Sequence, residues 1–137
     1  MTRPAPSLTG ASRADRAQNL RLALAAAHTA AENRGQNILV LDLRKLTDLF
    51  DYFVIVTGTS RRQLRAMSEE IDHTLEDDLG DRRMGIDGFA ESRWIVLDYG
   101  TVVIHLFDEE TRRYYDLENL WAEAPRVDLP KAPAGTR

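Results

Sequence analysis

Apolar residues recur at three- and four-residue steps in two stretches of the chain, which predicts two amphipathic helices. The first is expected to begin after Ser12, which with Asp15 resembles a capping box, and to end near Asn33. Gly35 is placed to end it in the left-handed conformation. The residues expected on its inward face are Ala17, Leu20, Leu24, Ala27 and Ala31.

The second helix is expected to follow the capping box of Ser60 and Gln63 and to end near Leu79. The residues that form its single apolar face are Leu64, Met67, Ile71 and Leu75. The turn before it, residues 57–60, has the sequence Thr-Gly-Thr-Ser and connects a strand to this helix.

Runs rich in β-branched and aromatic residues predict four strands, over residues 37–43, 51–57, 94–97 and 102–107. The run 51–57 is apolar on both faces, as in an internal strand that is covered on each side. Residues 80–92 are expected to form a loop that contains at most a short strand. Residues 108–121 are expected to begin with a short helical turn and to pack Leu117, Leu120 and Trp121 onto the body.

This order of elements predicts an α/β fold. At 137 residues the chain fits a single domain, which we place at residues 12–123. Residues 1–11 are aperiodic, and residues 124–137 contain Pro125, Pro130 and Pro133. We expect both segments to be flexible tails.

The strand pair around Gly100 predicts a hairpin with one unusual face. With Tyr99 and Gly100 as the turn residues, Trp94 lies opposite His105. One face is then entirely aliphatic and belongs in the core. The other carries Trp94, Val96, Asp98, Thr101, Val103, His105 and Phe107. Two interpretations remain open for this face: a protein-docking surface with aromatic anchors, or a second core surface covered by a helix.

Arg61, Arg62 and Arg65 occupy the first turns of the second helix, where the helix dipole disfavours positive charge. Three positive charges at this unfavourable position indicate an acidic or phosphate-bearing partner that compensates for them. The alternative interpretation is a solvated basic face, and the pattern does not decide between the two.

Composition narrows the classes of function that fit. The net charge of -4 disfavours a protein that depends on broad phosphate contact, and the absence of cysteine excludes thiolate chemistry. His28, His73 and His105 lie on different elements without the spacing of metal ligands. No apolar run approaches membrane-spanning length, and the first residues lack the apolar stretch of a secretory signal.

Enzymes of the nucleotidyltransferase fold have a similar strand-to-helix turn, followed by paired carboxylates that hold two magnesium ions. Here Asp42, Asp51 and Asp98 are each solitary on their strands. We therefore expect no catalysis, although a relict nucleotide-binding protein that uses the turn at Gly58 stays open as an alternative.

Four blocks of sequence, in order and with similar spacing, resemble the ribosomal silencing factor (Iojap-like) family. They are Asp51–Ser60 (DYFVIVTGTS), Trp94–Gly100 (WIVLDYG), Val103–His105 (VIH) and Arg112–Trp121 (RRYYDLENLW). The resemblance covers roughly residues 38–121, and the agreement of several blocks makes it specific.

This resemblance implies an α/β domain with a mixed β-sheet flanked by helices, nucleotidyltransferase-like but without catalytic carboxylates and without a cofactor. It implies a cytoplasmic protein, a homodimer when free, that binds ribosomal protein L-fourteen on the large ribosomal subunit, blocks joining of the small subunit and represses translation when nutrients are scarce. The family's partner-contacting block maps onto Trp94, Asp98 and Tyr99, with His105 beside them. Arg61, Arg62 and Arg65 are candidates for a second contact, and a direct RNA-binding protein that uses them is the remaining rival.

Overall fold

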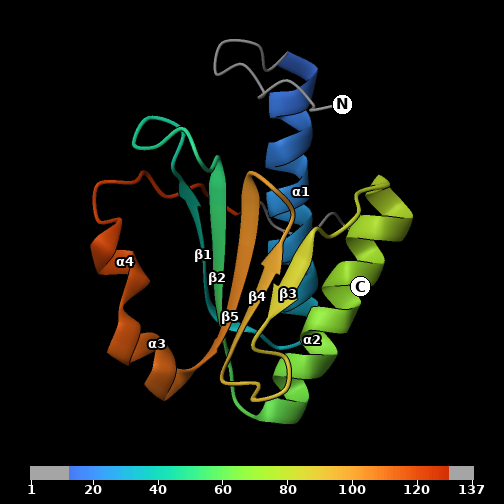
Figure 1. The fold of residues 1–137 in the computed structure, drawn as a ribbon, viewed down its shortest axis with the longest axis vertical. Helices are drawn as coiled ribbons and strands as arrows, with labels where there is room; N and C mark the ends of the chain where they lie inside the picture. The colour runs from blue at the N-terminus through green and yellow to red at the C-terminus, as the bar shows by residue number, and fades with distance from the viewer. Residues whose placement is uncertain (1–12, 130–137) are drawn as a thin grey trace, which may run out of the picture.

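A five-stranded sheet forms the centre of the computed structural model, which describes residues 13–129, with side chains from residue 16 onward (Figure 1). The strands are Gln36–Asp42 (β1), Tyr52–Gly58 (β2), Gly85–Asp87 (β3), Trp94–Asp98 (β4) and Val102–Asp108 (β5). Their spatial order is β1-β2-β5-β4-β3. Only β2 and β5 are parallel, and the other neighbours are antiparallel, so the sheet is mixed as expected.

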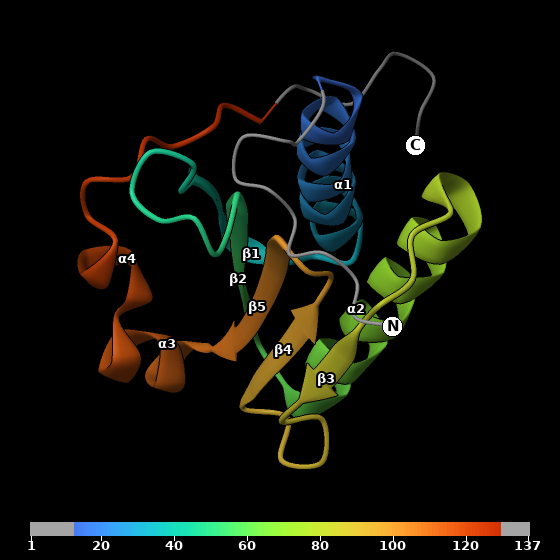
Figure 2. The same ribbon diagram turned by 45° about the horizontal axis from the view of Figure 1, so that its top comes forward.

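Helices cover both faces of this sheet (Figure 2). On one face lie Arg13–Glu32 (α1) and Arg61–His73 (α2), and α2 continues into the π-helical turn Thr74–Asp78 (η1). The short helices Glu109–Tyr115 (α3) and Leu117–Leu120 (α4) lie on the other face. The predicted single α/β domain is thus confirmed, whereas a relationship to nucleotidyltransferases stays a prediction. No helix within residues 13–129 is long and apolar enough to cross a membrane.

Strand β2 is buried along its whole length, as its doubly apolar sequence predicts. Its alternate side chains enter two different cores. Val54 and Val56 join the larger core beneath α1 and α2, whereas Phe53 and Ile55 join a smaller core on the other face. A charged substitution within β2 would therefore be buried on either face.

The predicted inward face of α1 is only partly correct. Alanines make up most of its closest contact with the sheet, at Ala23, Ala26, Ala27 and Ala30, whereas Ala17 and Ala31 are exposed. Because alanine and leucine occur on nearly every side of this helix, several inward stripes fit the sequence equally well. The sheet and α2 then decide which of them is buried.

The residue that ends α1 in the left-handed region is Arg34, with φ 67°, and not Gly35 as predicted. Gly35 has a different role, since a Cβ there would lie 2.6 Å from Val56 Cγ1 and 2.9 Å from the carbonyl oxygen of Ala30. Lack of space, and not backbone conformation, is what requires glycine at this position.

Helix α2 begins at the predicted cap and buries the predicted face. The Ser60 hydroxyl accepts a hydrogen bond from the Gln63 amide at 3.0 Å. The Gln63 side chain does not accept from the Ser60 amide, as a complete capping box requires. Its Oε1 instead accepts from the amide and hydroxyl of Thr59. Its Nε2 donates to the carbonyls of Asn33 and Arg34, which ties the start of α2 to the end of α1.

The β4–β5 hairpin has the predicted faces but not the predicted register. Trp94 pairs with Phe107 and Asp98 with Val103, so the turn is centred on Gly100 and Thr101. Gly100 has the expected positive φ, at 89°. The Asp98 carboxylate accepts from the Gly100 amide at 2.8 Å, and this hydrogen bond places the turn one residue later than predicted. The pairing shifts by two residues, so every side chain keeps its predicted face.

The predicted tail boundary at residue 124 is wrong for the first residues beyond it. Ala124 is buried, the Pro125 carbonyl accepts from the Asp42 amide at 2.8 Å, and the Val127 amide donates to the Val40 carbonyl at 2.8 Å. This segment therefore runs along the outer edge of β1. Residues 1–12 and 130–137, which include the proposed Ser12 cap, lie outside the described residues.

Candidate docking surface

The unusual face of the hairpin is covered over β5 and open over β4. Leu117 and Trp121 pack against it, and beneath them Val103, His105 and Phe107 are buried. The β4 side chains Trp94, Val96 and Asp98 are only half-buried. Leu120, which was predicted to pack inward as well, is 72% exposed. The face is thus a covered core surface over β5, whereas over β4 it stays open and docking there remains a prediction.

Trp94 stands at the boundary between the covered and the open part. Its indole stacks on Phe107, with ring centroids 4.8 Å apart, and lies 4.7 Å from the Tyr115 ring at a tilt of 45°. The indole Nε1–H donates to His105 Nδ1 at 3.1 Å. One edge of the indole is therefore held by the core.

An open groove of about 560 Å³ lies beside the indole. The residues that line it come from the β3–β4 loop, the start of β4 and α3; they are Gly88, Glu91, Arg93, Trp94, Glu110, Thr111, Tyr114 and Tyr115. Tyr114 and Tyr115 are 79% and 52% exposed and pack edge to face, 4.9 Å apart. We call this feature the Trp94 groove.

The two tyrosines were missed as site residues from the sequence. Their block, Arg112–Trp121, carried part of the family resemblance but was given no role in binding. The available signal was a pair of adjacent aromatic residues on a short helix that can bury only one side. Arg112 shows which side that is, because its guanidinium is buried and donates to Thr57 at 2.7 Å and to Glu118 at 2.9 Å.

His105 is not an accessible contact residue, contrary to the sequence-based expectation. Its side chain is 6% exposed and lies among aromatic rings, with Phe53 at 4.5 Å and Trp94 at 6.0 Å between centroids. Burial lowers the pKa of His105 to about 4, so the imidazole is neutral at pH 7. Its Nε2 has no hydrogen-bond partner within residues 13–129.

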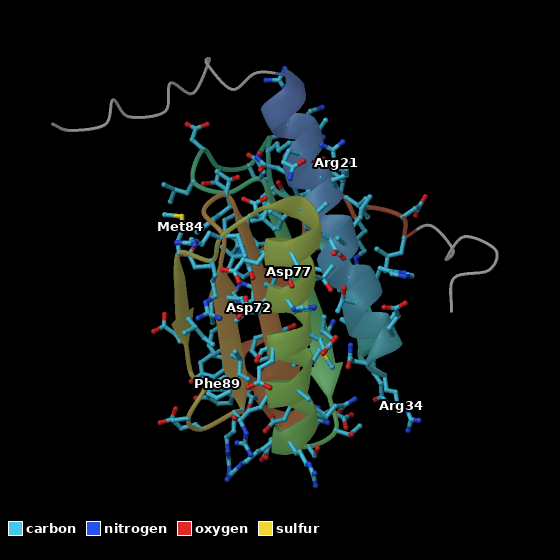
Figure 3. The ribbon with its side chains drawn as sticks, turned by 90° about the vertical axis from the view of Figure 1, so that its right-hand side faces the viewer. Arg21, Arg34, Asp72, Asp77, Met84 and Phe89 are labelled. Carbon is cyan, nitrogen blue, oxygen red and sulfur yellow. The ribbon has the colours of Figure 1, made fainter. Side chains whose placement is uncertain are left out.

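Tyr99 also lies away from the groove, on the face of the sheet that α1 and α2 cover. It is 8% exposed, and its hydroxyl donates to the Asp72 carboxylate, which also pairs with Arg83. Figure 3 shows Asp72 on the side of α2 that faces β3. Burial, and then the hydrogen bond to Asp72, raise the pKa of Tyr99 well above its usual range. Tyr99 therefore anchors the hairpin to α2 and offers nothing to a partner.

Asp98 is half-buried on β4, between β3 and β5, and its Oδ1 accepts from the Gly100 amide. Its Oδ2 makes no hydrogen bond within the described residues, so Asp98 still has an acceptor to offer a partner. Its place is at the turn end of β4, whereas Trp94 is at the opposite end of the same strand. The predicted contact residues Trp94 and Asp98 thus lie at opposite ends of β4 and do not form one cluster.

Arg61 and Arg62 are exposed at the start of α2 and have no ion pair or hydrogen bond within the described part of the chain. Arg65 donates to the Ser92 hydroxyl at 3.0 Å, next to Arg93, which lines the Trp94 groove. The end of α1 with Arg34 lies at the same end of the molecule (Figure 3). The predicted arginines therefore belong to a basic end that adjoins the groove.

The strand-to-helix turn at Gly58 is occupied by the protein's own side chains. A Cβ at Gly58 would lie 2.5 Å from Leu64 Cδ2, so glycine is needed there for close packing of α2 on the sheet. The Thr59 and Gln63 amides donate to Gln63 Oε1 and Ser60 Oγ, so these donors are engaged. Among residues 13–129, no three His, Cys, Asp or Glu side chains are grouped so that they could hold a metal ion.

Comparison with known proteins gives one consistent result. A family model described as "Ribosomal silencing factor during starvation" matches residues 15–137. The ribosomal silencing factor RsfS of Bacillus subtilis (strain 168) is 40% identical over 105 residues, which are 76% of this chain and 87% of that protein. The chloroplastic protein Iojap of Zea mays is 30% identical over 119 residues, 85% of this chain and 50% of that protein.

Two solved structures have the same fold. A protein from Chromobacterium violaceum superposes with a TM-score of 0.72 at 29% identity, over 85% of this chain and 95% of that one. A protein from Bacillus halodurans gives a TM-score of 0.66 at 29% identity, over 80% of this chain and 96% of that one. A family match over nearly the whole chain, together with these relatives, shows that this protein belongs to the ribosomal silencing factor family.

Proposed function

We propose that this protein acts in the cytoplasm as a ribosomal silencing factor without enzymatic activity. In this proposal the Trp94 groove docks on ribosomal protein L-fourteen of the large subunit, and the bound protein blocks joining of the small subunit and lowers translation when nutrients are scarce. The observation that carries the proposal is the half-exposed indole of Trp94, walled by the exposed rings of Tyr114 and Tyr115.

Aromatic side chains of this kind supply most of the binding energy in protein interfaces, because they bury a large area at a small cost in side-chain entropy. Glu91 and Glu110 line the same groove. Their charge is complementary to that of a basic ribosomal protein, which favours the correct partner and the correct orientation. Asp98 adds a carboxylate at the far end of β4.

The test is co-sedimentation of the full chain with isolated ribosomal subunits in sucrose gradients. The wild type is expected with the large subunit and not with the small one. Replacement of Trp94 by Ala should weaken binding by about 2 kcal/mol or more, roughly 30-fold, as for the central residue of an interface. Because Trp94→Ala also removes core contacts, Tyr115→Ala, which changes a more exposed ring, serves as a second variant.

The control is Leu49→Ala, which removes an exposed apolar side chain from the β1–β2 loop, away from the groove. This variant should bind as the wild type does. Folded Trp94→Ala and Tyr115→Ala proteins that retain wild-type affinity would contradict docking at the groove. A subunit-rejoining assay by light scattering tests the block itself, which should appear with the wild type and disappear with the groove variants.

Arg61 and Arg62 are proposed as a second contact, with phosphate groups of the large subunit beside the docked groove. Their support is that neither has an acidic partner in the described chain and that both are exposed at the end of the molecule next to Arg93. Arg65 contributes less, since its guanidinium already binds Ser92.

The alternative of a relict nucleotide-binding protein has less support, because side chains of the protein already accept from the Thr59 and Gln63 amides at this turn. Calorimetry with nucleoside triphosphates and magnesium tests it, and saturable binding would revive it. We also propose a homodimer for the free protein, which sedimentation equilibrium tests directly.

A further inference from the structure

His105 is a buried polar residue that packs against the smaller core, with its ring 4.5 Å from that of Phe53. The buried members of that core are Leu41, Leu43, Phe53, Ile55, Val103, Phe107 and Ala124. An apolar side chain of similar size would fill the same place without burying two polar nitrogens. The presence of a histidine here therefore requires an explanation beyond packing.

Its hydrogen bonding indicates what the imidazole does. Nδ1 accepts from the Trp94 indole Nε1–H at 3.1 Å, so the proton of the neutral ring is on Nε2. That Nε2–H is buried and has no acceptor among the described residues. The fold thus leaves one donor of His105 unsatisfied while the other nitrogen serves Trp94.

The remaining restraints on the indole do not specify its direction. Phe107 stacks on it and Tyr115 tilts against it, and both are contacts between ring surfaces. Either contact would persist if the indole flipped about the bond that joins it to Cβ, so that its opposite edge pointed inward. Among the described contacts of the indole, the hydrogen bond to His105 is the directional one, so it specifies which edge points inward and which edge is offered to the Trp94 groove.

We propose that His105 is a positioning residue for docking: its buried Nδ1 holds the Trp94 indole in one orientation, without contact between His105 and the partner. This inference rests on the proposed docking at the Trp94 groove. An anchor that is already ordered in the free protein loses less conformational entropy on binding, so the hydrogen bond contributes to affinity from inside the core.

Two substitutions separate positioning from packing. In His105→Phe the ring volume stays, while the acceptor for Trp94 and the unsatisfied Nε2–H are both removed. In His105→Asn the side-chain oxygen can take the place of Nδ1 as acceptor, but ring volume is lost. If His105 is purely structural, the variant that loses more stability should also lose more affinity. If His105 positions Trp94, the more stable variant, His105→Phe, should be the weaker binder.

The measurements use the full-length protein labelled with ¹⁵N-tryptophan. Of the two indole N–H resonances, that of Trp94 is identified with Trp94→Phe, since Trp121 gives the other. The Trp94 resonance should shift in His105→Phe and stay near its wild-type position in His105→Asn. Thermal unfolding should show His105→Phe at least as stable as the wild type and His105→Asn less stable.

Large-subunit binding completes the experiment. His105→Phe should bind roughly 3- to 10-fold more weakly, the range expected for one hydrogen bond, and His105→Asn should bind more tightly than His105→Phe. The control is Ile104→Val, on the same strand but in the other core, which should lower stability without a change in affinity.

Wild-type affinity in His105→Phe, with Trp94→Ala still impaired, would overturn the role of His105 and leave the proposed function intact. An unshifted Trp94 resonance in His105→Phe would also overturn it. If Trp94→Ala and Tyr115→Ala themselves bind like the wild type, docking at the groove fails, and the positioning role fails with it.

Discussion

At the scale of single residues, the burial of His105 couples the stability of the fold to pH. Its pKa falls from the ordinary 6.5 to about 4 in the folded protein, because burial disfavours the charged ring. Between these two values the unfolded chain binds a proton at this position and the folded chain does not. The free energy of unfolding must therefore decrease as the pH falls through this window.

Urea unfolding at pH 7 and at pH 4.5 tests this coupling. The wild type should lose about 2 kcal/mol more stability than His105→Phe between the two conditions, from about 1.4 kcal/mol per unit of pKa difference. The comparison with the variant removes every pH-dependent contribution that the two proteins share. Parallel losses in the two proteins would contradict the lowered pKa.

The residues of the site show what a sequence pattern can and cannot specify. The alternation of the hairpin placed Trp94 and His105 on the same face, and both are there. Alternation says nothing about what lies above a face, and so it did not show that α3 and α4 cover His105 and leave Trp94 half-exposed. Tyr99 was predicted to be a turn residue, but in the structure it continues the alternation of Ile95 and Leu97 and joins the larger core.

At the scale of elements, the segment after α4 extends the sheet at the β1 edge. Pro125 and Val127 exchange backbone hydrogen bonds with Asp42 and Val40, and Arg126 bridges to Leu41. An unpaired edge strand exposes backbone groups that can pair with other chains. The segment covers the edge of β1, so it is part of the fold.

Truncation after residue 123 should therefore destabilise the protein relative to truncation after residue 129. The first truncation removes the buried Ala124 and three backbone hydrogen bonds, those of Ala124, Pro125 and Val127, a loss of about 2 kcal/mol or more. Thermal unfolding by circular dichroism measures both. Equal melting temperatures for the two truncated proteins would show that the segment adds nothing to stability.

Elements with two independent signals were predicted best. Helix α2 has a cap at Ser60 and one narrow apolar face, and its start and buried side follow the prediction. Helix α1 has apolar residues on nearly every side, so its inward face could not be chosen from periodicity. The hairpin register depended on the hydrogen bond from Gly100 to Asp98, which the turn residues alone did not reveal.

At the scale of the whole molecule, charge is distributed unevenly. The chain has a net charge of -4, yet Arg61, Arg62 and Arg93 lie at the end that adjoins the Trp94 groove. Carboxylates of the groove and arginines beside it would then meet different parts of one partner, since a large ribosomal subunit offers both basic protein and RNA phosphate.

Simultaneous replacement of Arg61 and Arg62 by Gln should make large-subunit binding less dependent on salt. Each lost phosphate contact is expected to lower the slope of log K against log salt by about 0.7 to 0.9. Replacement of Arg82, an exposed arginine in the loop before β3, by Gln is the control and should leave the slope unchanged. An unchanged slope in the double variant would exclude phosphate contact at these two positions.

The sequence by itself determined the α/β class, the internal position of β2, the cap and face of α2 and the two faces of the hairpin. These features depend on residues near one another in the chain, because period, capping and turn chemistry act over a few positions. Four separated blocks together also indicated the family. Local patterns thus carried most of the fold.

Tertiary structure alone decided which residues of the unusual hairpin face are accessible. That outcome depends on where α3, α4 and the segment beyond them lie over the sheet, and their positions are set by distant contacts such as Arg112 with Thr57. Burial is a property of the assembled layers and not of any short stretch of chain. For this reason Trp94 is half-exposed at the edge of the groove while His105, on the neighbouring strand, is part of the core.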